Sequence, residues 1–194
     1  MTKRLKTVLI TGGVKRIGLS IARVLHDNNY NIIITYNKSS KQARDILTEL
    51  NNKSKDSCKI IKVDFSKISN FSKFCGDALK CFGRLDVLIN NASRFYPTKI
   101  DQVNHKSWID LIDTNLKSPL MLSKVFCSEL KKRKGNIINI IDIHIDPPLK
   151  DHIIYNISKA GLLALTKTLA KDLAPQIRVN GVSPGAIMWP EADE

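Results

Sequence analysis

Short runs of apolar, largely β-branched residues alternate along the chain with longer stretches in which apolar residues recur every three or four positions. The short runs predict strands buried on both faces, and the longer stretches predict helices with one apolar side. The predicted strands are Thr7–Thr11, Asn31–Tyr36, Cys58–Asp64, Asp86–Asn90, Gly135–Asp142 and Arg178–Ser183, and the predicted helices cover residues 16–28, 39–52, 68–82, 101–131 and 152–173.

This alternation predicts a parallel sheet, because consecutive parallel strands need a long crossover, which is usually a helix. We therefore expect an α/β protein with a Rossmann-type, doubly wound parallel sheet and helices on both faces. The chain has 194 residues, of which 43% are apolar, and we expect residues 1–194 to form a single domain around one core. Ligands of such sheets bind beyond the carboxyl ends of the strands.

The segment after the first predicted strand, residues 11–18, reads TGGVKRIG. It stands between an apolar run and a helical pattern, where backbone N–H groups and a helix N-terminus can bind a pyrophosphate. Gly12 permits torsions closed to other residues, and Gly18 lets the helix approach the sheet closely. Leu19 and Ser20 follow where the phosphate loop of NTPases needs Lys and then Ser or Thr, so that class is excluded. The turn predicts a dinucleotide site.

Tyr155 and Lys159 lie one helical turn apart and therefore share one face of a predicted helix. A phenol has a pKa of about 10, and a cation nearby favours the phenolate. We therefore expect Lys159 to lower the pKa of Tyr155 and make it a usable proton donor. Asp142, at the end of the fifth predicted strand, is a third candidate catalytic side chain.

The chain carries 31 Lys and Arg against 18 Asp and Glu, a net charge of +13. The basic residues are scattered, and the few aromatic residues are not interleaved with them as a nucleic-acid stacking surface requires. We expect no specific nucleic-acid partner. The positive field favours anionic ligands such as a phosphorylated dinucleotide.

The four cysteines form no Cys-x-x-Cys pair, and no histidine stands at metal-ligand spacing from a second ligand. We predict reduced thiols, no metal site and a cytoplasmic protein. No apolar stretch approaches the ~20 residues of a membrane span, so no membrane partner is expected. His144 and His152 are expected to have ordinary surface or hydrogen-bonding roles.

Taken together, the motifs resemble those of the short-chain dehydrogenase/reductase family, and within it the chain is most similar to the pteridine reductases. The shared positions are residues 11–18, Asp64, Asn90-Asn91-Ala92, Asn115, Tyr155, Lys159 and Pro184-Gly185.

Three departures from the usual family pattern point to the pteridine reductases: Arg16 and Ser93 replace glycines, and Asp142 replaces a serine. The runs at residues 93–98, SRFYPT, and 188–191, MWPE, also resemble that subfamily.

The resemblance implies roles for individual residues. Asp64 is expected to contact the adenine amino group. Asn115 is expected to kink its helix and help hold Lys159 through water, which makes it a fourth candidate catalytic residue. The expected cofactor-binding residues are Thr11, Gly12, Lys15, Arg16, Ile17, Gly18, Asn37, Lys38, Ser39, Asp64, Asn91, Ala92, Ser93, Tyr155, Lys159, Pro184 and Gly185.

The choice of cofactor is made at the end of the second predicted strand. A carboxylate there would bind the ribose hydroxyls of NAD, but this chain has Asn37, Lys38 and Ser39. Cations and hydroxyls suit a 2′-phosphate, so we expect NADPH as the cofactor.

Asp142 also bears on the substrate. A carboxylate repels the negative charge that develops when a ketone is reduced, but it suits a substrate that presents N–H groups. We therefore expect reduction of a pteridine, with Phe95 stacking on it and with Arg16, Ser93, Asp142 and Tyr155 as further substrate contacts.

Two alternatives remain open: a 3-oxoacyl-thioester reductase of the same family, and a non-catalytic dinucleotide-binding or truncated remnant protein. The family usually continues beyond the Pro-Gly turn, so we expect this chain to lack the last helix and strand. A homo-oligomer, either a dimer or a tetramer, is also expected.

Overall fold

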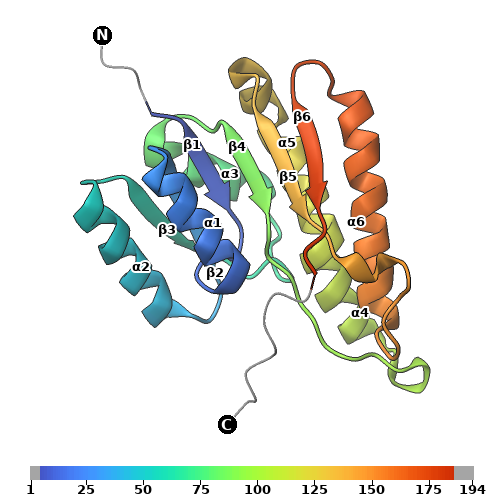
Figure 1. The fold of residues 1–194 in the computed structure, drawn as a ribbon. Helices are drawn as coiled ribbons and strands as arrows, with labels where there is room; N and C mark the ends of the chain where they lie inside the picture. The colour runs from blue at the N-terminus through green and yellow to red at the C-terminus, as the bar shows by residue number, and fades with distance from the viewer. Residues whose placement is uncertain (1–4, 186–194) are drawn as a thin grey trace.

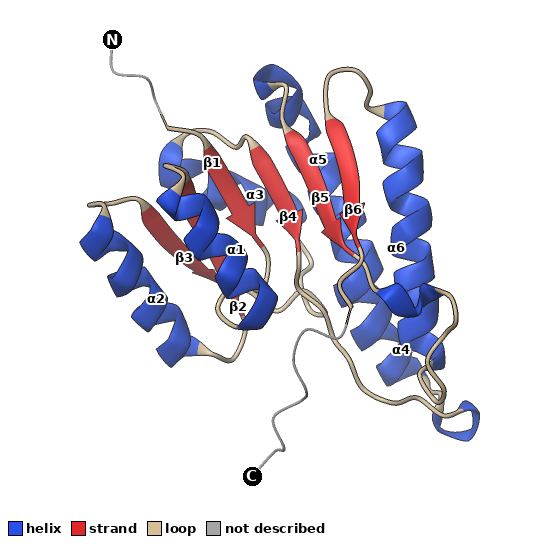
Figure 2. Ribbon diagram, in the orientation of Figure 1, coloured by secondary structure: helices blue, strands red, loops and turns tan. Residues whose placement is uncertain are grey.

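The computed structural model describes residues 5–185, which form a single parallel sheet flanked by helices (Figures 1 and 2). In its first half β1 (Thr7–Ile10), β2 (Asn31–Tyr36) and β3 (Cys58–Lys62) alternate with α1 (Arg16–Asp27), α2 (Ser40–Lys53) and α3 (Phe71–Phe82). In its second half the strands are β4 (Val87–Asn90), β5 (Asn136–Ile140) and β6 (Arg178–Val182), and the long helices are α4 (His105–Ile112), α5 (Ser118–Arg133) and α6 (Ile153–Asp172).

The sheet has the strand order β3-β2-β1-β4-β5-β6, and every pair is parallel. The predicted Rossmann-type fold is therefore confirmed. The order reverses between β1 and β4, where Leu9 pairs with Leu88. At this point the chain leaves β1 toward one side of the sheet and β4 toward the other, which opens a crevice at the carboxyl edge.

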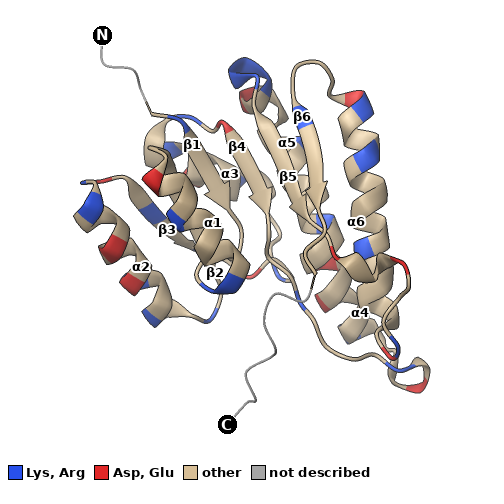
Figure 3. Ribbon diagram, in the orientation of Figure 1, with Lys and Arg blue, Asp and Glu red and all other residues tan. Residues whose placement is uncertain are grey.

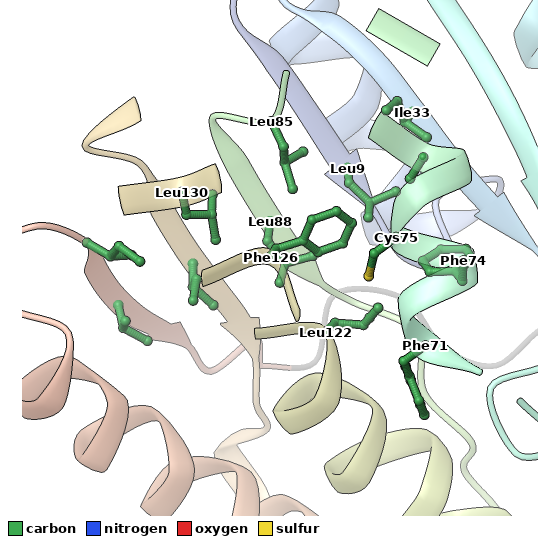
Figure 4. Close-up of a cluster of buried hydrophobic side chains, with 14 of the residues drawn as sticks. Leu9, Ile33, Phe71, Phe74, Cys75, Leu85, Leu88, Leu122, Phe126 and Leu130 are labelled. Atoms are coloured by element: carbon green, nitrogen blue, oxygen red, sulfur yellow. The ribbon is translucent and has the colours of Figure 1, made fainter. Parts of the chain in front are cut away.

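Alternate residues of the central strands face two separate cores. Leu9, Ile33 and Leu88 pack with α3 and α5, while Val8 and Ile10 pack on the opposite face with α1 and α2. Figure 4 shows Phe126 of α5 beside Leu88 in the first of these cores, with Phe74 of α3 near Cys75. Burial on both faces explains why the strands are continuous apolar runs.

The predicted helix at residues 101–131 is wrong as a single regular element. A short 3₁₀ turn (Ile100–Gln102) precedes α4, and a π-helical turn (Asp113–Lys117) separates α4 from α5. Pro119 lies in the first turn of α5, where its missing N–H costs nothing. The π turn places Asn115 in the interior, with 1% of its surface exposed.

The charged side chains are dispersed rather than gathered on one element, as Figure 3 shows for α1, α2, α5 and α6. The basic run that begins at Lys131 ends α5, where cations complement the helix dipole. β6 lies at the edge of the sheet, and among its five residues only Val179 is buried. No helix within residues 5–185 is long and apolar enough to cross a membrane.

Candidate active site

The turn after β1 is shaped for close approach to its backbone. Gly12 has φ +63°, and a Cβ there would lie 3.0 Å from the Cα of Ala92. A Cβ on Gly18 would lie 2.6 Å from Nδ2 of Asn91 and 2.7 Å from the oxygen of Gly12. Arg16 begins α1 with φ +49°, which fits its replacement of a glycine. Side chains are excluded here, so the backbone itself is left to meet a ligand.

Hydrogen bonds join this turn to the one after β4. The hydroxyl of Thr11 accepts from the N–H groups of Asn91 and Ala92 at 2.9 Å, and it donates to the oxygen of Ile89 at 3.3 Å. The side-chain amide of Asn91 donates to the oxygens of Thr11 and Gly12, both at 2.9 Å. These bonds fix the two central turns of the carboxyl edge in one arrangement.

A cavity of about 330 Å³ lies over these turns, where we expect the adenosine and pyrophosphate part of a dinucleotide. The N-terminus of α1 points at it, and the hydroxyl of Thr114 at its border is buried without a partner among the described residues. Its lining includes the expected residues Gly12, Lys15, Arg16, Ile17, Gly18, Asn37, Asp64, Asn91, Ala92 and Ser93.

Asp64 lies at the adenosine end of this cavity. Partial burial opposes its ionisation, but hydrogen bonds from Ser66 and Asn37 and the charge of Arg94 together hold the pKa of Asp64 below its usual value. Arg94 lies 3.5 Å from Asp64 and 3.3 Å from Asp110, so its guanidinium bridges the end of β3 to α4. The sequence analysis assigned Arg94 no such role, since only the fold brings these carboxylates together.

Lys38 and Ser39 stand apart from the lining of this cavity. Lys38 is exposed and borders a neighbouring cavity that it shares with Asp64 and Arg94. Ser39 is the N-cap of α2, and its side chain makes no capping hydrogen bond. Lys38 therefore lies on the side of Asp64, and Ser39 follows it in the chain.

A second cavity of about 350 Å³ continues from the first and shares Arg16, Ile17, Asn91 and Ser93 with it. The remaining residues come from the ends of β5 and β6, from α6 and from the loop after β4. Its lining includes Phe95, Asp142, His144, Tyr155, Lys159, Pro184 and Gly185. The chain therefore brings Asp142, Tyr155, Lys159 and the Pro-Gly turn to one cavity, whereas Asn115 is outside its lining and the run at 188–191 lies outside the described residues.

Tyr155 donates a short hydrogen bond to Oδ2 of Asp142, and Oδ1 of the same carboxylate accepts from the N–H of His144 at 2.8 Å. Burial, this hydrogen bond and the charge of Asp142 raise the pKa of Tyr155 well above its ordinary value. The expectation that Lys159 lowers this pKa is therefore wrong for the protein's own groups. Burial, followed by the carboxylate of Asp142, sets the direction of the shift, and the phenol stays protonated.

Lys159 is buried on α6, one turn beyond Tyr155. Its Nζ donates to the oxygen of Ile140 at 2.9 Å and lies 5.7 Å from the centre of the Tyr155 ring. Burial lowers the pKa of Lys159 to about 8, although the charge of Asp142 opposes the shift. Lys159 borders the second cavity, and none of the described carboxylates forms an ion pair with its ammonium group.

Asn115 makes direct hydrogen bonds to the loop after β4 and to α6. Its Oδ1 accepts from the N–H of Arg94 at 2.7 Å, and its Nδ2 donates to the oxygen of Arg94 and to Oγ of Ser158, both at 3.0 Å. No direct contact with Lys159 is among these bonds. Asn115 holds the loop that carries Phe95 against the helix that carries Tyr155.

Two histidines that the sequence analysis set aside lie at this site. His144 borders the second cavity beside Asp142. His152 stacks on Phe95, with ring centres 4.9 Å apart and an angle of 15° between the planes. Both flank the site in sequence, close to Asp142 and Tyr155, but neither stands at metal-ligand spacing, so the sequence analysis assigned them only ordinary roles. Within residues 5–185 no group of three His, Cys, Asp or Glu side chains is arranged to hold a metal ion.

Comparison with known proteins agrees with this arrangement. The sequence model of the short chain dehydrogenase family matches residues 6–193. The chain belongs to that family, and thus to the oxidoreductases that use a nicotinamide dinucleotide.

Among individual relatives, pteridine reductase 1 of Leishmania tarentolae is 31% identical over 222 aligned positions, which cover 94% of this chain and 77% of the relative. The 3-oxoacyl-acyl-carrier-protein reductase of Staphylococcus epidermidis is 34% identical over 185 positions, covering 94% of this chain and 75% of the relative. The enzyme of the same name from Staphylococcus aureus is 33% identical over 188 positions, covering 96% and 76%. Similarity alone does not choose between the two activities.

Proposed function

We propose that this chain reduces a pteridine with NADPH. The observation that carries the proposal is the contact between Tyr155 and Asp142 at a cavity that Phe95 also borders. A proton donor, a carboxylate and an exposed aromatic ring therefore border the same cavity. That combination suits a flat heterocycle with N–H groups.

The carboxylate favours a pteridine over a ketone. When a ketone is reduced its oxygen gains negative charge, and Asp142 beside Tyr155 would repel that charge. A pteridine ring instead presents N–H donors that a carboxylate accepts, and its reduction ends with a proton on a ring nitrogen. Asp142 therefore weakens the alternative reaction and supports the proposed one.

NADPH, when bound, supplies a hydride to the substrate. Tyr155 is protonated at neutral pH, and it delivers that proton from Oη toward the substrate with Asp142 alongside. Lys159, already at the wall of the cavity, offers its ammonium to the ribose next to the nicotinamide. The turns at Gly12 and Asn91 hold the pyrophosphate and position the cofactor.

NADPH is proposed over NADH because of the groups beside the adenosine end. Lys38 is exposed there, Ser39 leaves its hydroxyl uncommitted to capping, and α1 begins with Lys15 and Arg16. These donors and cations suit a 2′-phosphate. The carboxylate that would bind two ribose hydroxyls is missing at the end of β2.

Reduction of a 3-oxoacyl thioester is the second candidate, supported by relatives of that name with 33–34% identity. The loss of NADPH absorbance, followed with a dihydropterin, with an acetoacetyl thioester and with neither, separates the possibilities. We expect turnover with the dihydropterin. Turnover with the thioester alone would establish the second candidate, and NADPH binding without turnover of either would indicate a non-catalytic protein.

A further inference from the structure

Phe95 lies in an unusual aromatic environment for an exposed loop residue. Its side chain is 58% exposed, yet it stacks on His152 and meets the ring of Tyr155 edge-on, with centres 4.8 Å apart and an angle of 81°. Phe95 borders the second cavity, whereas His152 is absent from the described lining. His152 therefore supports Phe95 from outside the cavity.

The ring of His152 is itself fixed. Its Nδ1 lies 2.7 Å from the oxygen of Lys150. A carbonyl only accepts, so Nδ1 carries the proton of this hydrogen bond. His152 is also the N-cap residue of α6, and Tyr155 follows within the first turn of that helix. The imidazole is thus attached to the same rigid element as the proton donor.

The loop that carries Phe95 is fastened to the same helix end. Thr98 is 3% exposed. Its hydroxyl accepts a hydrogen bond from the N–H of Ile154 at 3.1 Å, and its own N–H donates to the oxygen of Asp151 at 2.6 Å. Thr98 and His152 also form an isolated parallel bridge. Backbone and ring contacts together set the distance between the loop and α6.

We propose that His152 is a positioning residue that holds the Phe95 ring in the orientation needed to stack on the substrate. The inference rests on the proposed function for the identity of that substrate, a flat pteridine. An exposed phenylalanine on a loop samples several rotamers, and a ligand that needs one of them must order the ring. The imidazole orders the ring beforehand, because offset stacking favours one orientation.

The first test measures pteridine binding by calorimetry on the complex with NADP⁺, together with KM and kcat. In His152→Ala we expect affinity about 2- to 10-fold weaker, the range of one aromatic pair. KM should rise in proportion, while kcat and NADPH affinity stay close to those of the unmodified protein. His152→Phe restores a stacking ring without the hydrogen bond to Lys150, and it should recover most of the affinity.

His105→Ala is the matched control, because His105 is an exposed histidine at the start of another helix and lies outside both cavities of the site. It should leave pteridine affinity unchanged. If His152→Ala binds pteridine as tightly as the unmodified protein, or if His152→Phe binds no better than His152→Ala, the positioning role is refuted.

A second test needs no substrate and therefore separates this inference from the proposed function. The ring protons of His152, assigned by NMR through their loss in His152→Asn, should be shifted upfield by the Phe95 ring. The shift should vanish in Phe95→Leu. An upfield shift in a protein that binds no pteridine would support the stack and refute the proposed function, whereas no shift would overturn the inference whatever the substrate.

Discussion

The phenol of Tyr155 and the carboxylate of Asp142 share a hydrogen bond, although thirteen residues separate them in the chain. β5 delivers the carboxylate at its carboxyl end, and the first turn of α6 delivers the phenol. Burial and this contact together raise the pKa of Tyr155, and the contact gives the carboxylate a hydrogen-bond donor until a substrate competes for it. The first two predictions follow from it.

Tyr155→Phe should reduce kcat by about 10²- to 10⁴-fold, because it removes the proton donor and leaves the ring that meets Phe95. Binding of NADPH should change by less than about twofold, since the glycine turn and Lys159 are intact. Steady-state kinetics and a fluorescence titration of NADPH check the two halves. A variant with undiminished kcat would show that Tyr155 is structural.

Asp142→Asn should lower the pKa of Tyr155, because it removes the negative charge that now raises it. The same change lowers the pKa of Lys159, whose ammonium the charge of Asp142 favours, so the alkaline limb of the kcat profile should move to lower pH than in the unmodified protein. Pteridine turnover should also fall, because an amide accepts the N–H groups of the substrate less strongly. An alkaline limb that stays in place would contradict this account.

Lys38→Asp should shift the cofactor preference toward NADH. A charge-assisted contact to the 2′-phosphate contributes about 1.5–3 kcal/mol, so NADPH affinity should weaken by about 10- to 100-fold. Lys41→Asp, an exposed change of the same charge within α2, is the control for the general field. An equal loss of NADPH affinity in both variants would rule out a specific contact between Lys38 and the 2′-phosphate. Equal affinities of the unmodified protein for NADPH and NADH would also rule it out.

Gly18→Ala should abolish NADPH binding and destabilise the protein, because the added Cβ meets Asn91 and the backbone of Gly12. Gly76→Ala is the matched control: a Cβ there has open space, and α3 should gain about 0.5–1 kcal/mol. Thermal unfolding and an NADPH titration distinguish the two variants. Normal binding by Gly18→Ala would mean that the turn tolerates side chains.

His26 should make the protein less stable in acid. Its Nε2 donates to Ser57, which itself donates to Ser54 at 2.5 Å, and Nδ1 is buried without a partner among the described residues. Burial lowers the pKa of His26 below its ordinary 6.5. The unfolded chain therefore binds the proton more readily, and stability is lost as the pH falls from 6.5 through the lowered value.

Urea unfolding at about pH 7 and about pH 5 measures this loss. His26→Gln retains a donor for Ser57 but does not titrate, so it should lose less stability over the same interval. An identical loss of stability in His26→Gln and in the unmodified protein would mean that a group other than His26 titrates over this interval.

The fold was predictable because its cause is local. Strands such as Asn31–Tyr36 need apolar residues on both faces, and the pattern in the sequence reports that need directly. The π turn was not predictable in this way. It is stabilised by tertiary bonds from Asn115 to Arg94 and Ser158, which are 21 and 43 residues away.

The candidate site was predictable where a motif carries the chemistry, as with Tyr155, Lys159 and the glycine turn. The sign of the Tyr155 shift was not, because it depends on how closely Asp142 approaches and on how deeply the pair is buried. His152 was overlooked for a similar reason. Two rings stack because the fold brings them together, and no sequence motif marks the residue that becomes the stacking partner.

The π-helical turn at Asp113–Lys117 has a consequence for how variants and relatives of this chain are aligned. A π turn holds one residue more than the α-helical turn it replaces. Deleting a single residue there would let the two flanking helices join into one regular helix and would rotate Asn115 away from Arg94. A one-residue gap at these positions is therefore a larger change than several substitutions elsewhere in α5, and it marks a relative in which the Phe95 loop must be anchored by other means.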